Sequence, residues 1–247
     1  MTTTTIHHDK KSVGKKTPFP SSVAKKVLDF FFCHGSKTDF VYSSEFPRWI
    51  PRKLAKSGRP MFVAVGGCAR ELRNSHEGSV FFTSVFGEVI RSKGPIEMGS
   101  GGTADGVPGF CGDVREKYGS DVFLVGWRTE GRRMLEPPDP RYDVTLVLTS
   151  AISVWEREVH SYFNMLGMVK NLNPEKKIVF MVFGGGEIAT IEALYAIEEG
   201  YPIVIVKGSG GTADSFAENR TITSKQNVHV VPYNAQATID KLIELLN

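Results

Sequence analysis

Two kinds of hydrophobic pattern alternate along the chain. Short continuous apolar runs rich in β-branched residues are typical of strands that are covered on both faces, since neither face meets water. The longer segments between them carry apolar residues every three or four positions, which predicts amphipathic helices. The runs predict strands over Met61–Val65, Pro95–Met98, Asp121–Gly126, Val144–Thr149, Ile178–Phe183, Ile203–Lys207 and Val228–Val231.

Helical periodicity fills most of the spaces between these strands. The segment Glu187–Glu199 is followed by Gly200 and Pro202, and a glycine with a proline just beyond it is a normal helix stop. The predicted helices are Val23–Phe32, Ser79–Lys93, Gly106–Tyr118, Ser153–Lys170, Glu187–Glu199 and Thr238–Asn247. Strands that alternate with helices predict a Rossmann-like α/β fold, a doubly wound and mostly parallel sheet with helices on both faces.

The pattern also divides the chain into parts. Residues 1–15 are polar and predict a flexible tail, residues 16–60 predict an extension packed on the main domain, and residues 61–247 predict one Rossmann-like domain. The stretch Glu130–Arg141 contains three prolines, and we interpret it as a long loop that covers the site or serves an interface.

Composition narrows the function classes. The chain has 41% hydrophobic and 23% charged residues, the balance of an ordinary soluble protein. A net charge of +3 without a basic stripe argues against a nucleic-acid partner. No apolar run approaches the ~20 residues of a membrane span, and no secretory signal begins the chain. We therefore expect a cytoplasmic, soluble protein with no membrane contact, and a homo-oligomer remains open.

Cysteine and histidine spacing gives no reason to expect a metal. Cys33, Cys68 and Cys111 are far apart, which indicates reduced thiols inside a cell and not a disulfide framework. The six histidines show no metal-ligand spacing. The sequence therefore predicts no metal and no required cofactor.

The heptapeptide GSGGTAD occurs twice, at Gly99–Asp105 and at Gly208–Asp214. Each copy follows an apolar run and precedes a plausible helix. A glycine turn between a strand and a helix presents backbone N–H groups that suit a phosphate. The repeat therefore points to a nucleotide-like ligand.

Four glycine turns follow predicted strands, at Gly66-Gly67, Gly101-Gly102, Gly184–Gly186 and Gly208–Thr212. Any one of them taken alone is explained by the positive φ of a tight turn. Together they lie at the carboxyl ends of parallel strands, where doubly wound sheets bind ligands. None fits GxGxxG or GxxxxGK[ST], which argues against the usual dinucleotide and P-loop sites. The candidate phosphate-binding residues are Gly66, Gly67, Arg70, Gly101, Gly102, Thr103, Gly184, Gly185, Gly186, Ser209, Gly210, Gly211 and Thr212.

Several side chains near these turns have two interpretations. Asp105 and Asp214 either cap helices or bind a ribose hydroxyl. Thr103 and Thr212 either cap or touch phosphate, and Arg70 either pairs with phosphate or lies on a solvated helix face. Trp127 and Arg128 either frame a base or, in the case of Trp127, pack under the proline loop.

The order of these motifs resembles the SLOG superfamily, and most closely its LSDAT branch at the N-terminus of melastatin-type TRP channels. The resemblance covers roughly residues 60–218. It is carried by VAVGGCARE, GGTADGV, VFGGGEIATIEAL and YPIVIVKGSGGTADSFAE. The resemblance implies a Rossmann-like domain that binds nucleotide-derived ligands such as ADP-ribose. This chain carries no channel segments, so we expect a free-standing sensor or enzyme.

A second branch, the LOG type often misnamed lysine decarboxylase, implies an alternative. Its phosphoribohydrolases carry PGGxGTxxE and cleave nucleoside monophosphates. Here Gly184 replaces the Pro and Thr190 is displaced by one position. The catalytic candidates are Glu187 and Glu192, since such cleavage needs a carboxylate near the ribose. Each glutamate is also explained by the helix dipole alone. No PLP lysine motif is visible, so we do not expect a decarboxylase.

Overall fold

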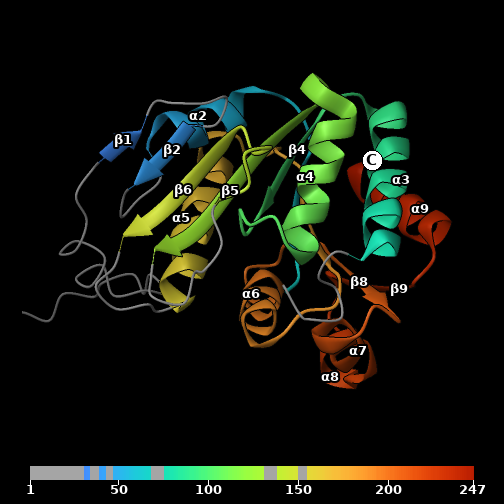
Figure 1. Cartoon of the computed structure of the whole chain (residues 1–247). Coiled ribbons are helices and arrows are strands. Elements are labelled where there is room, and N and C mark those ends of the chain that lie inside the picture. Colours follow the sequence, from blue (N-terminus) through green and yellow to red (C-terminus); the bar gives the residue numbers. More distant parts are fainter. Residues whose placement is uncertain (1–30, 34–38, 43–46, 68–74, 131–137, 150–154) are drawn as a thin grey trace, which may run out of the picture.

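The computed structural model describes residues 31–33, 39–42, 47–67, 75–130, 138–149 and 155–247. These residues form one sheet with helices on both faces (Figure 1). None of the helices within these ranges is long and apolar enough to cross a lipid bilayer.

The sheet of the described residues runs in the order β1-β2-β6-β5-β4-β3-β7-β8-β9. Strands β1 and β2 pair antiparallel, and every other neighbouring pair is parallel. The predicted doubly wound, mostly parallel sheet is therefore confirmed. The strands are β1 Phe31–Cys33, β2 Asp39–Tyr42, β3 Met61–Val65, β4 Ile96–Ser100, β5 Val122–Glu130, β6 Val144–Thr149, β7 Ile178–Val182, β8 Ile203–Lys207 and β9 Val228–Pro232.

The helices divide between the two faces of the sheet. Helices α3, α4 and α9 pack on one face, and α2, α5, α6 and α7 pack on the other, each over its own apolar core. The C-terminus lies beside α3 (Figure 1). The helices are α2 Trp49–Lys56, α3 His76–Lys93, α4 Gly106–Tyr118, α5 Trp155–Leu172, α6 Glu187–Glu198, α7 Gly211–Glu218, α8 Arg220–Thr223 and α9 Ala235–Leu246, with a 3-10 turn at Gly119–Asp121.

Strand β3 lies where the chain changes direction across the sheet. Its register with β7 runs from Met61↔Ile178 to Val65↔Val182, while β4, the next strand in the chain, pairs with its other edge. In open parallel sheets such a reversal creates a crevice at the carboxyl ends of the strands. The carboxyl ends of β3 and β7 therefore mark the expected ligand edge.

The N-terminal region differs from its prediction. The helix predicted over Val23–Phe32 falls mostly outside the described residues, and its last two positions, Phe31 and Phe32, belong to strand β1. Strand β2 extends the sheet by pairing with β6, and the Asn173 side-chain amide donates to the Ala55 carbonyl to hold α2 against the end of α5. The division into tail, extension and main domain stays a prediction.

Candidate functional site

Gly66 lies where three elements meet at the carboxyl edge of the sheet. A Cβ built on Gly66 would stand 2.4 Å from the Phe183 carbonyl oxygen and 2.4 Å from Cγ2 of Val107. Because no side chain fits there, the end of β3, the end of β7 and the first turn of α4 come into close contact. The first, second and third glycine turns therefore border one region.

The third turn, Gly184–Gly186, is held by the fourth. The Gly184 N–H donates to Ser209 Oγ at 2.8 Å. In the other direction the Thr212 N–H donates to the Gly185 carbonyl at 2.9 Å, and the Ala213 N–H donates to the Gly184 carbonyl at 3.1 Å. The φ angles of +59° at Gly184 and +102° at Gly185 require glycine, since residues with a Cβ rarely adopt them.

The threonine side chains complete this connection. Thr212 Oγ1 donates to the Gly186 carbonyl at 2.9 Å, and Thr190 Oγ1 donates to the same oxygen at 3.1 Å. The two hydroxyl oxygens lie 2.9 Å apart. Sequence reasoning treated Thr190 only as a displaced motif residue. Its role is visible only in three dimensions, because its partner is 22 positions away.

The two GSGGTAD copies have different structures. In the first copy Gly99 and Ser100 end strand β4, and α4 begins only at Gly106, after the whole heptapeptide. In the second copy the strand has already ended, and α7 begins at Gly211, inside the heptapeptide. Identical residues therefore occupy strand and turn in one copy, and turn and helix in the other.

The first copy lies under the described end of the proline loop. Thr103 forms an antiparallel bridge with Pro138, and the Asp139 N–H donates to the Gly102 carbonyl at 3.1 Å. Arg141 anchors this segment, because its guanidinium pairs with the buried Asp139 at 2.7 Å and donates to the Gly109 carbonyl at 3.1 Å. The end of the loop covers the second turn, and residues 131–137 lie outside the described ranges.

The aspartates of the two copies also differ. Asp105 occupies the N-cap position of α4, but its side chain makes no capping hydrogen bond there. Asp214 lies in the first turn of α7 and accepts a hydrogen bond from the Gly208 N–H, which closes the turn before the helix. The capping interpretation is therefore wrong for the Asp105 side chain, while Asp214 stabilises its own turn.

The two candidate glutamates have different surroundings. Glu187 is exposed at the first position of α6. Burial raises the pKa of Glu192 to about 8, and hydrogen bonding by Tyr162 and Trp127 lowers it in part. A carboxyl group with this pKa holds its proton at neutral pH. Glu187 therefore faces solvent at the ligand edge, whereas Glu192 faces the core on the α5 side.

Trp127 is a core residue of that same side. Its side chain is fully buried and stacks on Tyr162 with ring centroids 4.3 Å apart. The described part of the proline loop contacts α4, on the opposite face of the sheet. Trp127 therefore packs against α5 and not under the described part of the proline loop, and it is too buried to stack on a ligand base.

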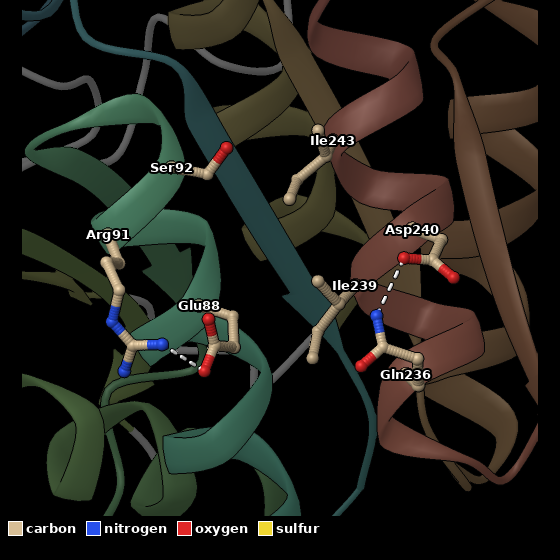
Figure 2. A pocket seen from close by; sticks show the side chains of 7 residues that line it. All are labelled: Glu88, Arg91, Ser92, Gln236, Ile239, Asp240 and Ile243. Carbon is tan, nitrogen blue, oxygen red and sulfur yellow. Dashed lines mark hydrogen bonds and ion pairs between the residues drawn. The ribbon is translucent and has the colours of Figure 1, made fainter.

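A cavity of about 370 Å³ opens beside the first copy. It lies between the first turns of α3 and α4, and Ser75, His76, Asp113 and Arg141 are among the residues that line it. A smaller groove of about 260 Å³ lies between the C-terminal half of α3 and α9, and no residue of the glycine turns lines it (Figure 2). Glu88 with Arg91 and Gln236 with Asp240 form polar pairs along the sides of this groove (Figure 2).

The remaining candidates fall into two groups. Arg70 and Cys68 lie outside the described residues, and Arg128 is buried near the end of β5. Within the described ranges no group of three histidine, cysteine, aspartate or glutamate side chains could hold a metal ion. The binding roles of the glycines, Ser209 and Thr212 stay predictions.

These observations define the chain as a Rossmann-like α/β protein with glycine turns gathered at its topological switch point. The family model described as SLOG in TRPM, prokaryote, matches residues 59–244, so the chain belongs to this prokaryotic LSDAT family of the SLOG superfamily. The resemblance inferred from the motifs is thereby confirmed. The comparison with curated proteins gave no match.

Solved structures share the fold at low sequence identity. The X-ray structure of TM1055, a structural-genomics target, is 18% identical with a TM-score of 0.53, over 75% of this chain and 99% of that one. The molybdenum cofactor carrier protein of Chlamydomonas reinhardtii is 16% identical with a TM-score of 0.53, over 76% and 98%. The molybdenum cofactor binding protein of Rippkaea orientalis is 13% identical with a TM-score of 0.52, over 76% and 98%.

Proposed function

We propose that this protein binds a nucleotide-derived ligand at the carboxyl edge of the sheet, as a sensor or binding module. A phosphate or diphosphate of the ligand lies against the Gly184–Gly186 turn and the start of α6. The preferred ligand is ADP-ribose or a relative of it, in keeping with the family. The protein requires no further cofactor for binding.

The observation that carries this proposal is the direction of three peptide groups. The carbonyls of Gly184, Gly185 and Gly186 all accept hydrogen bonds from α7 residues. In a trans peptide the N–H of the next residue points the opposite way, so the N–H groups of Gly185, Gly186 and Glu187 point away from α7. Within the described residues none of these three N–H groups donates a hydrogen bond.

The position of this turn supports an anionic ligand. The turn follows β7 at the switch point beside β3, and its N–H groups combine with the positive end of the α6 dipole. Consecutive N–H groups that point one way form an anion-binding concavity. Two of the fold neighbours are named for molybdenum cofactor, so that cofactor belongs in the panel of test ligands.

The test uses a proline substitution at Glu187, the first residue of α6. Proline is tolerated at this position and removes the N–H together with the glutamate side chain, and the extended φ of −114° at Gly186 suits a residue that precedes proline. Glu187→Pro should weaken ADP-ribose binding by about tenfold or more, the loss expected for one hydrogen bond to a charged group. Isothermal titration calorimetry measures both dissociation constants.

Glu187→Ala is the matched control, because it keeps the N–H and removes a negative charge. It should bind ADP-ribose at least as tightly as the parent chain. Adenosine, which lacks phosphate, should bind much more weakly than ADP-ribose to every variant. Equal affinity of the Pro and Ala variants for ADP-ribose would show that the Glu187 N–H does not contact the ligand. If neither a nucleotide, nor an ADP-ribose relative, nor molybdenum cofactor raises the melting temperature, the binding function itself is wrong.

A phosphoribohydrolase is the second candidate, and the exposed Glu187 at the start of α6 is the carboxylate that lies at the proposed ligand edge. Release of free base from a panel of nucleoside monophosphates, followed by chromatography, is the direct assay. Activity that is lost in Glu187→Gln would favour the hydrolase, and no release by the parent chain would eliminate it.

A further inference from the structure

Several polar groups of the second GSGGTAD copy form hydrogen bonds with the neighbouring turn, Gly184–Gly186. Helices α6 and α7 lie side by side at this edge (Figure 1). Ser209 Oγ accepts from the Gly184 N–H and donates to the Val206 carbonyl at 2.6 Å. The N–H and the hydroxyl of Thr212 both donate to carbonyls of the third turn. Together with the Ala213 N–H, which donates to the Gly184 carbonyl, two side chains and two backbone amides of this copy are thereby occupied.

Thr212 is also enclosed. The residue is 5% exposed, and its hydroxyl lies between the Gly186 carbonyl and Thr190 Oγ1. A ligand phosphate would have to displace these hydrogen bonds to reach it. The residue that follows the turn glycines in the sequence therefore faces the protein and not the ligand edge.

The contacts also fix which way the third turn faces. The Gly184 N–H points to Ser209, on the β8 side, so the Phe183 carbonyl must point to the β3 side. The 2.4 Å separation between that oxygen and a Cβ built on Gly66, at the end of β3, agrees with this direction. From Gly184 onward the carbonyls turn to α7, and the free N–H groups therefore face the β3 side, where the switch-point crevice lies.

Close packing prevents the turn from relaxing toward α7. A Cβ built on Gly211 would stand 2.1 Å from the Gly185 carbonyl oxygen, and Gly211 itself has a φ of +51°. The start of α7 thus touches the backbone of the third turn directly. The turn and the helix start form one hydrogen-bonded unit.

We propose that Ser209 and Thr212 are positioning residues: they hold the Gly184–Gly186 turn so that its N–H groups face the ligand, and they do not contact the ligand themselves. This inference rests on the proposed function. In this inference the fourth glycine turn orients the third, and the third turn alone contacts the phosphate.

The first part of the test needs no ligand. In 15N-labelled protein, Thr212→Val should shift the amide resonances of Gly185, Gly186 and Glu187, and it should accelerate by about tenfold the hydrogen exchange of the Ala213 N–H, which donates to the Gly184 carbonyl. Thr212→Ser keeps the hydroxyl and should restore both measurements. Thr223→Val removes a threonine hydroxyl from α8, whose oxygen donates to the nearby Arg220 carbonyl, and should leave the three amides unchanged.

The second part adds inorganic phosphate as the probe. In the parent chain, phosphate should shift the amides of Gly185, Gly186 and Glu187 and leave that of Thr212 nearly unmoved. Thr212→Val should weaken this binding about threefold to tenfold, while Thr212→Ser and Thr223→Val stay within twofold of the parent chain. The conservative rescue distinguishes orientation from general loss of stability.

The outcomes separate the two proposals. If Thr212→Val leaves the three amides unchanged without phosphate, the positioning role is wrong, whatever phosphate does. If Thr212 shows the largest shift with phosphate, it is a ligand contact and the positioning role is also wrong. If the variant disturbs the amides as expected but phosphate shifts none of them in the parent chain, the proposed function is wrong. Thr212 then orients the turn without serving a ligand.

Discussion

At the scale of single residues, the same glycine serves different physical needs in the two copies of the heptapeptide. Gly99 lies within β4, and a Cβ there would stand 2.3 Å from Cη2 of Trp127. Gly208, its counterpart, has a φ of +97° after β8. The first glycine is required for space beside an indole and the second for backbone conformation, so identical letters do not indicate an identical role.

Gly99→Ala should therefore destabilise the protein by about 1–3 kcal/mol through overpacking against Trp127. Gly167→Ala is the matched control, because no atom lies within 4 Å of its Cβ position in the interior of α5. It should instead stabilise by roughly 0.5–1 kcal/mol, since alanine favours a helix more than glycine does. Urea unfolding of both variants measures the difference. Equal midpoints would contradict the contact with Trp127.

At the scale of elements, one buried cation fastens α2 to the amino-terminal edge of the sheet. Lys176 Nζ donates to the Leu54 carbonyl at 2.6 Å, to Ser57 Oγ at 2.9 Å and to Glu97 Oε2 at 2.7 Å. The Lys176 and Glu97 side chains are almost completely buried. The pair therefore connects the end of α2 with β4 and with the loop before β7, at the opposite edge from the glycine turns.

Lys176→Met should cost about 3–5 kcal/mol, because it leaves the Glu97 carboxylate buried without its cation. Adding Glu97→Gln should recover part of this loss, since a neutral amide costs less to bury. The control is Lys241→Met, which removes a surface ion pair with the exposed Glu244 and should change stability much less than Lys176→Met does. Chemical unfolding of these three variants and of Glu97→Gln alone supplies the comparison, and additive single effects would argue against coupling.

At the scale of the whole molecule, Glu192 makes global stability depend on pH. Its pKa rises from 4.5 to about 8 on folding, mainly because of burial, so the folded chain binds a proton that the unfolded chain releases. The stabilising contribution is complete below about pH 4.5 and is lost as the pH rises through 8. Glu192→Gln should match the parent chain near pH 4.5 and be more stable by a few kcal/mol near pH 9. Thermal unfolding of both proteins across this pH range tests the prediction. Parallel curves of stability against pH would mean that the Glu192 carboxyl group is in water.

The sequence alone was sufficient to predict the fold class, the core strands and the positions of the glycine turns. Continuous apolar runs located the core strands, with β3, β6 and β8 predicted to the residue, and the glycines after them located the turns. Helix α3 begins three residues earlier than predicted, at His76, because the Ser75 hydroxyl accepts from the Gly78 N–H and caps it. Such local signals depend on nearby residues and can be found in one sequence.

The arrangement inside the site could not be predicted in the same way. The direction of the Gly185 carbonyl depends on Thr212, and the bridge at Thr103 depends on Pro138. These partners are distant in the sequence, and the same heptapeptide starts its helix at different positions in the two surroundings. The orientation of Glu192 toward Trp127 depends on packing that periodicity does not describe.

The central place of β3 has a consequence for biosynthesis. Its five residues are all buried, yet its neighbour β7 is translated about a hundred residues later. At about 5–20 residues per second, one edge of this apolar strand stays unpaired for roughly 5–20 s while the ribosome completes the sheet. During that interval the nascent chain exposes an edge strand with unpaired N–H and C=O groups, which can pair with other chains. The yield of the protein in the cell should therefore depend more on chaperones that shield such segments than on the final stability of the fold.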